Sequence, residues 1–379
     1  MSDRILDASL DELRATRTSV KWRFFPQDVL PVWVAEMDAR PCTPVVDAVT
    51  AALSRGDTGY GWAPPFAAAF ADFAGERWGW QVDPDDALVL PDVMIGVAEI
   101  IHALTKPGDA VVISPPVYDS FFGFVESTRR RLVTAPLDAD GRLDMGALAA
   151  AFVDAGPGSI YLLCSPHNPT GTVHTADELS ALATLADRHD VLVVSDEIHA
   201  PMTHPGVTFT PYLSLGAARR GIALVSASKS WNIAGLKAAL ALPGPDAQAT
   251  LGRLHEVVRH GANHLAVIAQ TVAYREGGPW LAQVTAELAE NRTLLGDLLA
   301  RELPTVVIHP SSATYLAWLD CRALGLGDDP AAQFVARGRV ALSSGLAYDP
   351  AARGFARFNY ATSPEVITEA VTRMRAALG

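Results

Sequence analysis

The residue with the clearest capacity for chemistry is a lysine at the end of an apolar stretch. Lys229 follows the apolar run 222–225 and is flanked by Ser226 and Ser228. A lone lysine in such a place is usually a solvated surface residue. Two hydroxyls spaced by one residue beside an amine suit an anion such as a phosphate group, and Lys237 could supply a second cation. The segment therefore predicts an anion site next to a reactive amine.

Two further polar residues follow apolar runs. Asp196 comes after the run 191–194, and a carboxylate there either caps the next element or is a buried charge that requires a cationic partner. Asn168 lies in the turn-rich segment 165–171, where its simplest interpretation is a turn former beside Pro169. Each residue alone is weak evidence for a site.

Tyr118 and Arg357 also have two interpretations each. Tyr118 follows two prolines and could stack on a ligand ring or fill the core. Arg357 lies in the strand-like run 355–360 among aromatic residues. A substrate carboxylate gripped by both guanidinium edges would satisfy it, and so would a structural salt bridge.

Short apolar strands alternate with longer helical stretches through the middle of the chain. Strands are predicted at 87–90, 110–113, 159–164, 191–196 and 222–225, and helices at 93–104 and 175–189. Thr175 and Glu178 form a capping box at the start of the second helix. This alternation predicts a mostly parallel sheet covered on both faces, with ligands bound beyond the carboxyl ends of the strands. Asn168, Asp196 and Lys229 all belong to those ends.

The rest of the chain divides into an N-terminal segment and a second domain. Residues 251–303 have a helical pattern broken at 277–279, and residues 306–379 mix strands with helices. We therefore predict a large domain over 46–280 and a smaller α/β domain over 281–379. The irregular, aromatic-rich segment 1–45 is expected to pack on the small domain or on a partner subunit.

The composition excludes several classes of function. A net charge of −12 argues against nucleic acid or an anionic membrane as the main partner. The polar start, the lack of a long apolar run and three scattered cysteines predict a cytoplasmic protein. His260 and His264 are predicted to share a helix face, but no acidic or cysteine ligand lies near them in sequence, so we predict no metal site.

Four motifs together resemble those of a known family. The segments 226–237, 165–171, 195–199 and 357–359 are similar, in order and approximate spacing, to the signatures of class I and II aminotransferases, which depend on pyridoxal 5′-phosphate (PLP). The segments 31–38, 21–22 and 59–62 resemble the cystathionine β-lyase-like branch, whose members are C–S lyases. The resemblance implies an α/β fold of the PLP-dependent transferase type I.

The same resemblance implies a role for each matching residue. Lys229 would carry PLP as a Schiff base and then move the substrate α-proton, and Asp196 would pair with the pyridine nitrogen. The other implied cofactor contacts are Asn168 and His199 beside the 3′-oxygen, Tyr118 on the ring face, and Ser226, Ser228, Lys237, Val93 and Met94 at the phosphate. Tyr60 would reach the phosphate of a neighbouring subunit, which implies a homodimer. Arg357, with the backbone near Ala35, would bind the carboxylate of a small amino-acid substrate.

The chain departs from the family pattern at three positions. Asp92 stands where the family usually has glycine, although an acid beside a phosphate is unfavourable unless it points away. Pro201 replaces an aspartate that is frequent in the lyase branch. Lys237 replaces an arginine, so the phosphate would meet a point charge in place of a bidentate fork.

The resemblance leaves the reaction open between two outcomes. Both a lyase and an aminotransferase begin by removing the substrate α-proton. The lyase branch predicts β-elimination from cystathionine or another cysteine S-conjugate, giving a thiol, pyruvate and ammonia. The alternative is transamination with a 2-oxo acid, and a more remote one is a non-catalytic regulatory or binding protein of the same fold.

Overall fold

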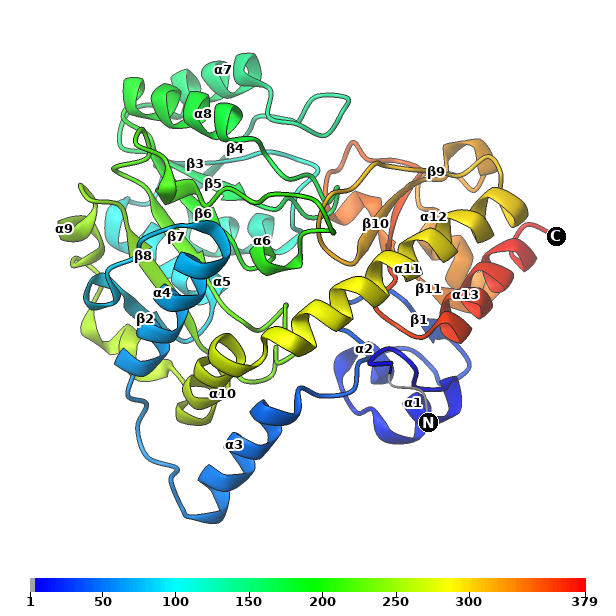
Figure 1. Ribbon diagram of the computed structural model, residues 1–379. Coiled ribbons are helices and arrows are strands. Elements are labelled where there is room, and N and C mark those ends of the chain that lie inside the picture. The colour runs from blue at the N-terminus through cyan, green and yellow to red at the C-terminus, as the bar shows by residue number, and fades with distance from the viewer. Residues whose placement is uncertain (1–3) are drawn as a thin grey trace.

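The computed structural model describes residues 4–379. A central sheet organises the larger of two α/β units (Figure 1). Its strands are β2 (Leu88–Leu90), β3 (Ala110–Ile113), β4 (Arg131–Thr134), β5 (Ile160–Cys164), β6 (Leu192–Asp196), β7 (Ile222–Val225) and β8 (Ala239–Pro243). Within the described residues their order is β2-β8-β7-β6-β5-β3-β4, and β8 alone runs opposite to the other strands. The mostly parallel sheet predicted from sequence is confirmed.

Helices cover both faces of this sheet because its strands are apolar on both sides. The helices α5 (Val93–Leu104) and α6 (Ser120–Ser127) share one hydrophobic cluster with Val111 and Ile113 of β3. The helices α7 (Met145–Ala155) and α8 (Ala176–Arg188) share another with Ala110 and Val112. Successive residues of β3 thus face opposite layers.

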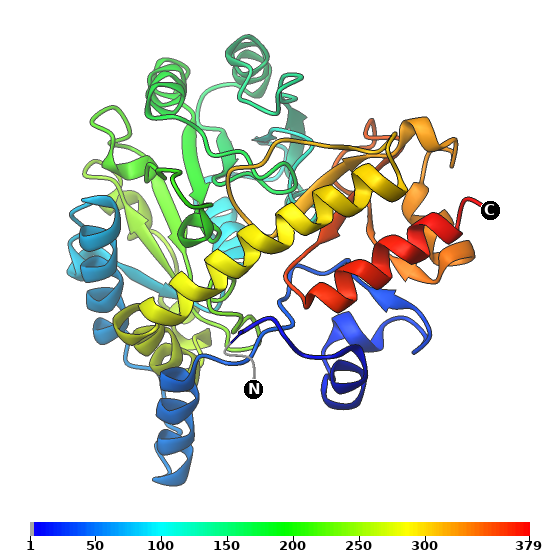
Figure 2. The same ribbon diagram turned by 45° about the vertical axis from the view of Figure 1, so that its right-hand side comes forward.

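The smaller unit is built on a second, antiparallel sheet. Its strands are β9 (Val307–Ile308), β10 (Leu316–Asp320), β12 (Ser343–Ser344) and β13 (Phe355–Asn359), in the order β12-β13-β10-β9. Its helices are α12 (Pro330–Gln333) and α13 (Pro364–Ala376). The long helix α11 (Gly278–Glu302) runs beside both units (Figure 2), and it packs on α13.

The N-terminal segment lies against the small unit. It contains α1 (Leu10–Thr16), α2 (Val20–Arg23) and β1 (Leu30–Pro31), which pairs with β11 (Val340–Ala341). Lys21 and Asp38 form a fully buried ion pair with 2.7 Å between Nζ and Oδ2. Lys21 Nζ also donates to the carbonyl of Glu36 (3.1 Å), so this pair fixes residues 36–38.

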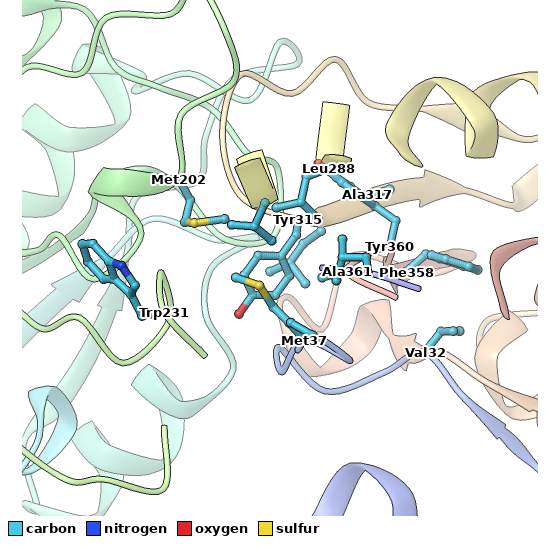
Figure 3. Close-up of a cluster of buried hydrophobic side chains, with 14 of the residues drawn as sticks. Val32, Met37, Met202, Trp231, Leu288, Tyr315, Ala317, Phe358, Tyr360 and Ala361 are labelled. Carbon is cyan, nitrogen blue, oxygen red and sulfur yellow. The ribbon is translucent and has the colours of Figure 1, made fainter. Parts of the chain in front are cut away.

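One hydrophobic cluster joins the N-terminal segment, the large unit and the small unit. Figure 3 shows Met37, Met202 and Tyr315 meeting at its centre, each from a distant part of the chain. Trp231, two residues after the predicted reactive lysine, belongs to the same cluster. The position of that lysine is therefore tied to the packing of both units.

The structure corrects the prediction of a continuous helix before residue 277. The helices α3 (Thr43–Ser54), α4 (Pro64–Trp78), α9 (Gln248–Leu251) and α10 (His264–Glu276) complete the large unit. Residues 252–263 are not α-helical, because Asn263 caps α10 and Gly261 packs on Pro91, where a β-carbon would lie 2.6 Å from Cγ. His260 lies in a 3₁₀ turn and His264 begins α10, so the predicted shared helix face was wrong.

Three further observations bear on the sequence predictions. Cys42, Cys164 and Cys321 are buried free thiols. Residues 4–379 contain no group of three His, Cys, Asp or Glu side chains arranged to hold a metal ion. Among the helices of the same residues, none has the length and apolar character needed to cross a bilayer.

Candidate active site

Lys229 lies in the loop that follows β7, at the carboxyl edge of the central sheet. Its Nζ donates a hydrogen bond to the carbonyl of Ala35 at 2.9 Å. Removal from solvent and the nearby Arg357 lower the pKa of this amine to about 8. A substantial fraction of the amine is therefore neutral near physiological pH, as a nucleophile or base requires.

Two residues that the sequence did not single out hold the lysine loop. Gln270 of α10 accepts from the N–H of Ala227 (2.9 Å) and donates to the carbonyl of Ala238 (2.6 Å). Asn232 exchanges two hydrogen bonds of 2.8 Å with the backbone of Met37. The loop is thus clamped to α10 on one side and to the N-terminal segment on the other.

Asp196 ends β6, the strand next to β7. It is buried, and burial raises the pKa of its carboxyl to about 6. Within residues 4–379 the only hydrogen-bond donor to the Asp196 carboxylate is the N–H of Ile198, at 3.1 Å from Oδ1. A buried carboxylate with so little support calls for a cationic partner.

His199 lies close to this carboxylate in sequence and is also buried. Burial lowers the pKa of its imidazole to about 3, so the ring is neutral. Its Nδ1 has no hydrogen-bond partner among the described residues. Since buried ring nitrogens are normally paired, this atom has spare capacity for a ligand.

Arg357 of β13 brings the small unit to the same site. One guanidinium nitrogen donates to Asn168 Oδ1 at 3.0 Å, and another donates to the carbonyl of Trp33 at 2.7 Å. The guanidinium lies over the ring of Tyr348, 4.9 Å from its centroid. Because Asn168 Oδ1 is engaged by Arg357, its amide nitrogen remains as the donor for a ligand.

The N-terminal segment connects the arginine and the lysine. Arg357 and Lys229 donate to carbonyls two residues apart, those of Trp33 and Ala35. Tyr315, which the sequence did not single out, donates its hydroxyl to the same Ala35 carbonyl at 3.1 Å. The guanidinium of Arg357 and the amine of Lys229 are therefore both held by backbone carbonyls of the stretch 33–35.

A cavity of about 210 Å³ lies beside Lys229, and most of the residues predicted to bind the phosphate line it. Its lining includes Asp92, Val93, Met94, Tyr118, Ile198, Ser226, Ser228, Lys229 and Lys237. The N–H groups of Val93 and Met94 open α5 and have no acceptor within residues 4–379. Such free N–H groups at a helix N-terminus attract anions. The hydroxyl of Ser226 is already engaged, because it donates to the carbonyl of Ala238 at 2.9 Å.

Several predicted positions are absent from the lining of this cavity, namely Ala35, Tyr60, Asn168, Asp196, His199, Pro201 and Arg357. Tyr60 is 98% exposed and lines a separate hollow of about 820 Å³ with Trp62, Arg259 and His260. Pro201 lies in a 3₁₀ turn, and its carbonyl accepts a hydrogen bond from Arg77 (3.2 Å).

Comparison with known proteins identifies the family. The model of the aminotransferases of class I and II matches residues 29–374. The chain belongs to this family. A Mycobacterium tuberculosis protein (strain CDC 1551 / Oshkosh) described as "Putative cystathionine beta-lyase" is 47% identical, covering 98% of this chain and 97% of its own. The cystathionine beta-lyase PatB of Bacillus subtilis (strain 168) is 35% identical, covering 97% and 98%.

A solved structure extends the likeness to the fold. The "putative plp-dependent beta-cystathionase" of Corynebacterium diphtheriae has a TM-score of 0.92 and 34% identity, covering 99% of each chain. The chain is therefore a PLP-dependent enzyme of fold type I in the cystathionine β-lyase-like branch, as its motifs predicted.

The residues present fit PLP. Asp196 is a buried carboxylate that has no cationic partner in hydrogen-bond contact among residues 4–379, and a protonated pyridine nitrogen would be such a partner. Among residues 4–379 the Nδ1 of His199, a ring that feels the charges of Lys229 and Arg357, has no hydrogen-bond partner. The N–H groups of Val93 and Met94 that open α5 likewise have no acceptor there, and both residues line the cavity. Lys229 supplies the amine.

Proposed function

We propose that this chain is a C–S β-lyase that cleaves cystathionine or related cysteine S-conjugates to a thiol, pyruvate and ammonia. The observation that carries the proposal is the pairing of Lys229 and Arg357 along the stretch 33–35. It sets an amine beside an anchor for an α-carboxylate, in a chain whose relatives bear the name of this activity.

The proposed roles follow from these positions. Arg357 binds the substrate carboxylate, which takes the place of the Trp33 carbonyl as its acceptor. Lys229 removes the proton from Cα, after which the sulfur leaves with the electron pair of the C–S bond. Asp196 would hold PLP at the pyridine nitrogen and keep that nitrogen protonated, and Asn168 would hold the ring on the side of the 3′-oxygen. When bound, PLP supplies the electron sink that makes the α-proton acidic.

The decisive experiment is turnover of L-cystathionine by the purified holoenzyme. We expect thiol and pyruvate to appear in equal amounts, with no requirement for a 2-oxo acid. Turnover that depends on a 2-oxo acid and releases no thiol would identify an aminotransferase. The Lys229→Ala variant serves as the blank for both assays.

The role of Arg357 gives a quantitative expectation. Arg357→Lys keeps the charge but loses the fork that grips a carboxylate, so kcat/KM for L-cystathionine should fall about a hundredfold, mainly through KM. Arg322→Lys makes the same change at an exposed arginine paired with Asp320 and should leave both constants unchanged. If kcat/KM falls equally in the two variants, Arg357 does not bind the substrate carboxylate.

We further propose that the enzyme works as a cytosolic homodimer in which Tyr60 completes the partner's phosphate site. The aromatic pair Tyr60 and Trp62, 98% and 70% exposed, supports a protein partner at this surface. The cytosol suits the three free cysteines.

Sedimentation and PLP titration test the role of Tyr60. We expect a dimer at micromolar concentration, and we expect Tyr60→Phe to weaken PLP affinity about tenfold through loss of a hydrogen bond to a charged group. A monomer that binds PLP with the same affinity in both forms would contradict the proposal.

A further inference from the structure

An ion pair between Asp92 and Lys237 lies at the N-terminus of α5. The family usually has a glycine at the position of Asp92. Asp92 Oδ1 accepts a hydrogen bond from the N–H of Ile95 (2.8 Å) and so caps the helix. Asp92 Oδ2 accepts from Lys237 Nζ, also at 2.8 Å. Both side chains line the cavity of about 210 Å³ beside Lys229.

This pair bears directly on how the cavity meets a phosphate. Besides Lys229, the lysine that anchors the cofactor, Lys237 is the one cationic side chain in the lining formed by the described residues. Its ammonium is a compact point charge, which the Asp92 carboxylate already holds. A phosphate monoester carries close to two negative charges at neutral pH, so it repels that carboxylate and attracts the same ammonium.

We propose that Asp92 competes with the cofactor phosphate for Lys237 and thereby lowers the affinity of this enzyme for PLP. The inference rests on the proposed placement of the phosphate at the start of α5. The ion pair is partly exposed, with side-chain exposures of 61% for Lys237 and 23% for Asp92, so the competition is moderate.

The substitution that isolates the charge is Asp92→Asn. Asparagine caps a helix as well as aspartate does, so α5 keeps its N-cap while the carboxylate is lost. We expect the Kd for PLP, measured by titrating dialysed apoprotein, to fall roughly two- to fivefold, as loss of an exposed competing ion pair predicts. Inorganic phosphate should likewise raise the melting temperature of Asp92→Asn more than that of the wild type.

A control substitution at another helix N-cap and a variant that lacks Lys237 test whether the change in PLP affinity arises from the Asp92–Lys237 pair. Asp144→Asn makes the same change at the N-cap of α7, where Asp144 accepts from Gly146 and Ala147, and should leave the Kd for PLP unchanged. Lys237→Met should raise that Kd. In the Lys237→Met background the gain from Asp92→Asn should be smaller, because only the direct repulsion between the carboxylate and the phosphate is then relieved.

Each contrary result has a distinct meaning. If Lys237→Met weakens PLP binding but Asp92→Asn does not tighten it, the competition is refuted and the phosphate placement stands. A gain that persists undiminished without Lys237 also refutes the competition. If Lys237→Met leaves the Kd unchanged, the placement and the competition fail together.

Discussion

Replacing Lys229 with alanine should lower kcat for L-cystathionine by at least about 10⁴-fold. The variant loses both the amine that attaches the cofactor and the base that removes the α-proton, and a positioned base alone contributes up to about 10⁴. The visible absorbance of the purified wild-type enzyme should also be lost. Steady-state thiol release and an absorbance spectrum of each protein measure the two effects.

The control for this experiment is a lysine outside the site. Lys106 is exposed in the turn before β3, and Lys106→Ala should retain full activity. A small primary amine added to Lys229→Ala should restore part of the proton transfer, which a misfolded protein could not show. Residual activity above about one per cent of wild type, without added amine, would mean that another group is the base.

The sequence located the parts of the site that depend on strand ends. Asp196 and Lys229 follow apolar runs, and the parallel order of β6 and β7 brings the ends of such runs to one edge. The helix at 175–189 was predicted from its capping box, which the structure contains at Thr175. In these cases a short stretch of sequence is enough to predict both the helix or strand and where it ends.

Other parts of the site depend on contacts between distant residues. The hydroxyl of Tyr315 meets a carbonyl 280 positions away, and Asn232 pairs with backbone 195 positions away. Gln270 could be recognised only as a polar residue on an otherwise apolar helix face. No local pattern identifies the partner of such a residue, because the partner is set by how the N-terminal segment docks on both units.

The helix break at 252–263 is a second feature that local sequence does not predict, because it is caused by a contact with a distant residue. The sequence there is compatible with a helix, but Gly261 must approach Pro91 closely enough to exclude a β-carbon. The contact lies beside Asp92 at the start of α5. Tertiary packing at the cofactor site therefore overrides local helical preference in this segment.

Asp196→Asn is expected to lower the activity of the enzyme and to raise the stability of its apoprotein. Asp196→Asn should lower kcat at least about a hundredfold, because an amide cannot hold a proton on the pyridine nitrogen. The same change should stabilise the apoprotein. Burial raises the pKa of Asp196 from 3.8 to about 6, so ionisation costs the folded state about 3 kcal/mol once both states are charged.

The sign and the pH window follow from that shift. A raised pKa means that Asp196 favours folding below the unfolded value and loses that contribution as the pH rises through about 6. The stabilisation of apoprotein by Asp196→Asn should therefore be complete at pH 8 and about half as large at pH 5. Denaturant unfolding of both apoproteins at the two pH values measures this difference.

Asp38→Asn provides the matched contrast. Asp38 is as deeply buried as Asp196, but it is paired with Lys21 at 2.7 Å and accepts from Trp22 Nε1 at 2.8 Å. Its neutralisation leaves the Lys21 charge unpaired in the core and should cost about 3–5 kcal/mol. The same chemical change thus stabilises one site and destabilises the other. A loss of apoprotein stability in Asp196→Asn would show that Asp196 already has a partner, which would contradict its proposed role as the carboxylate that waits for the cofactor.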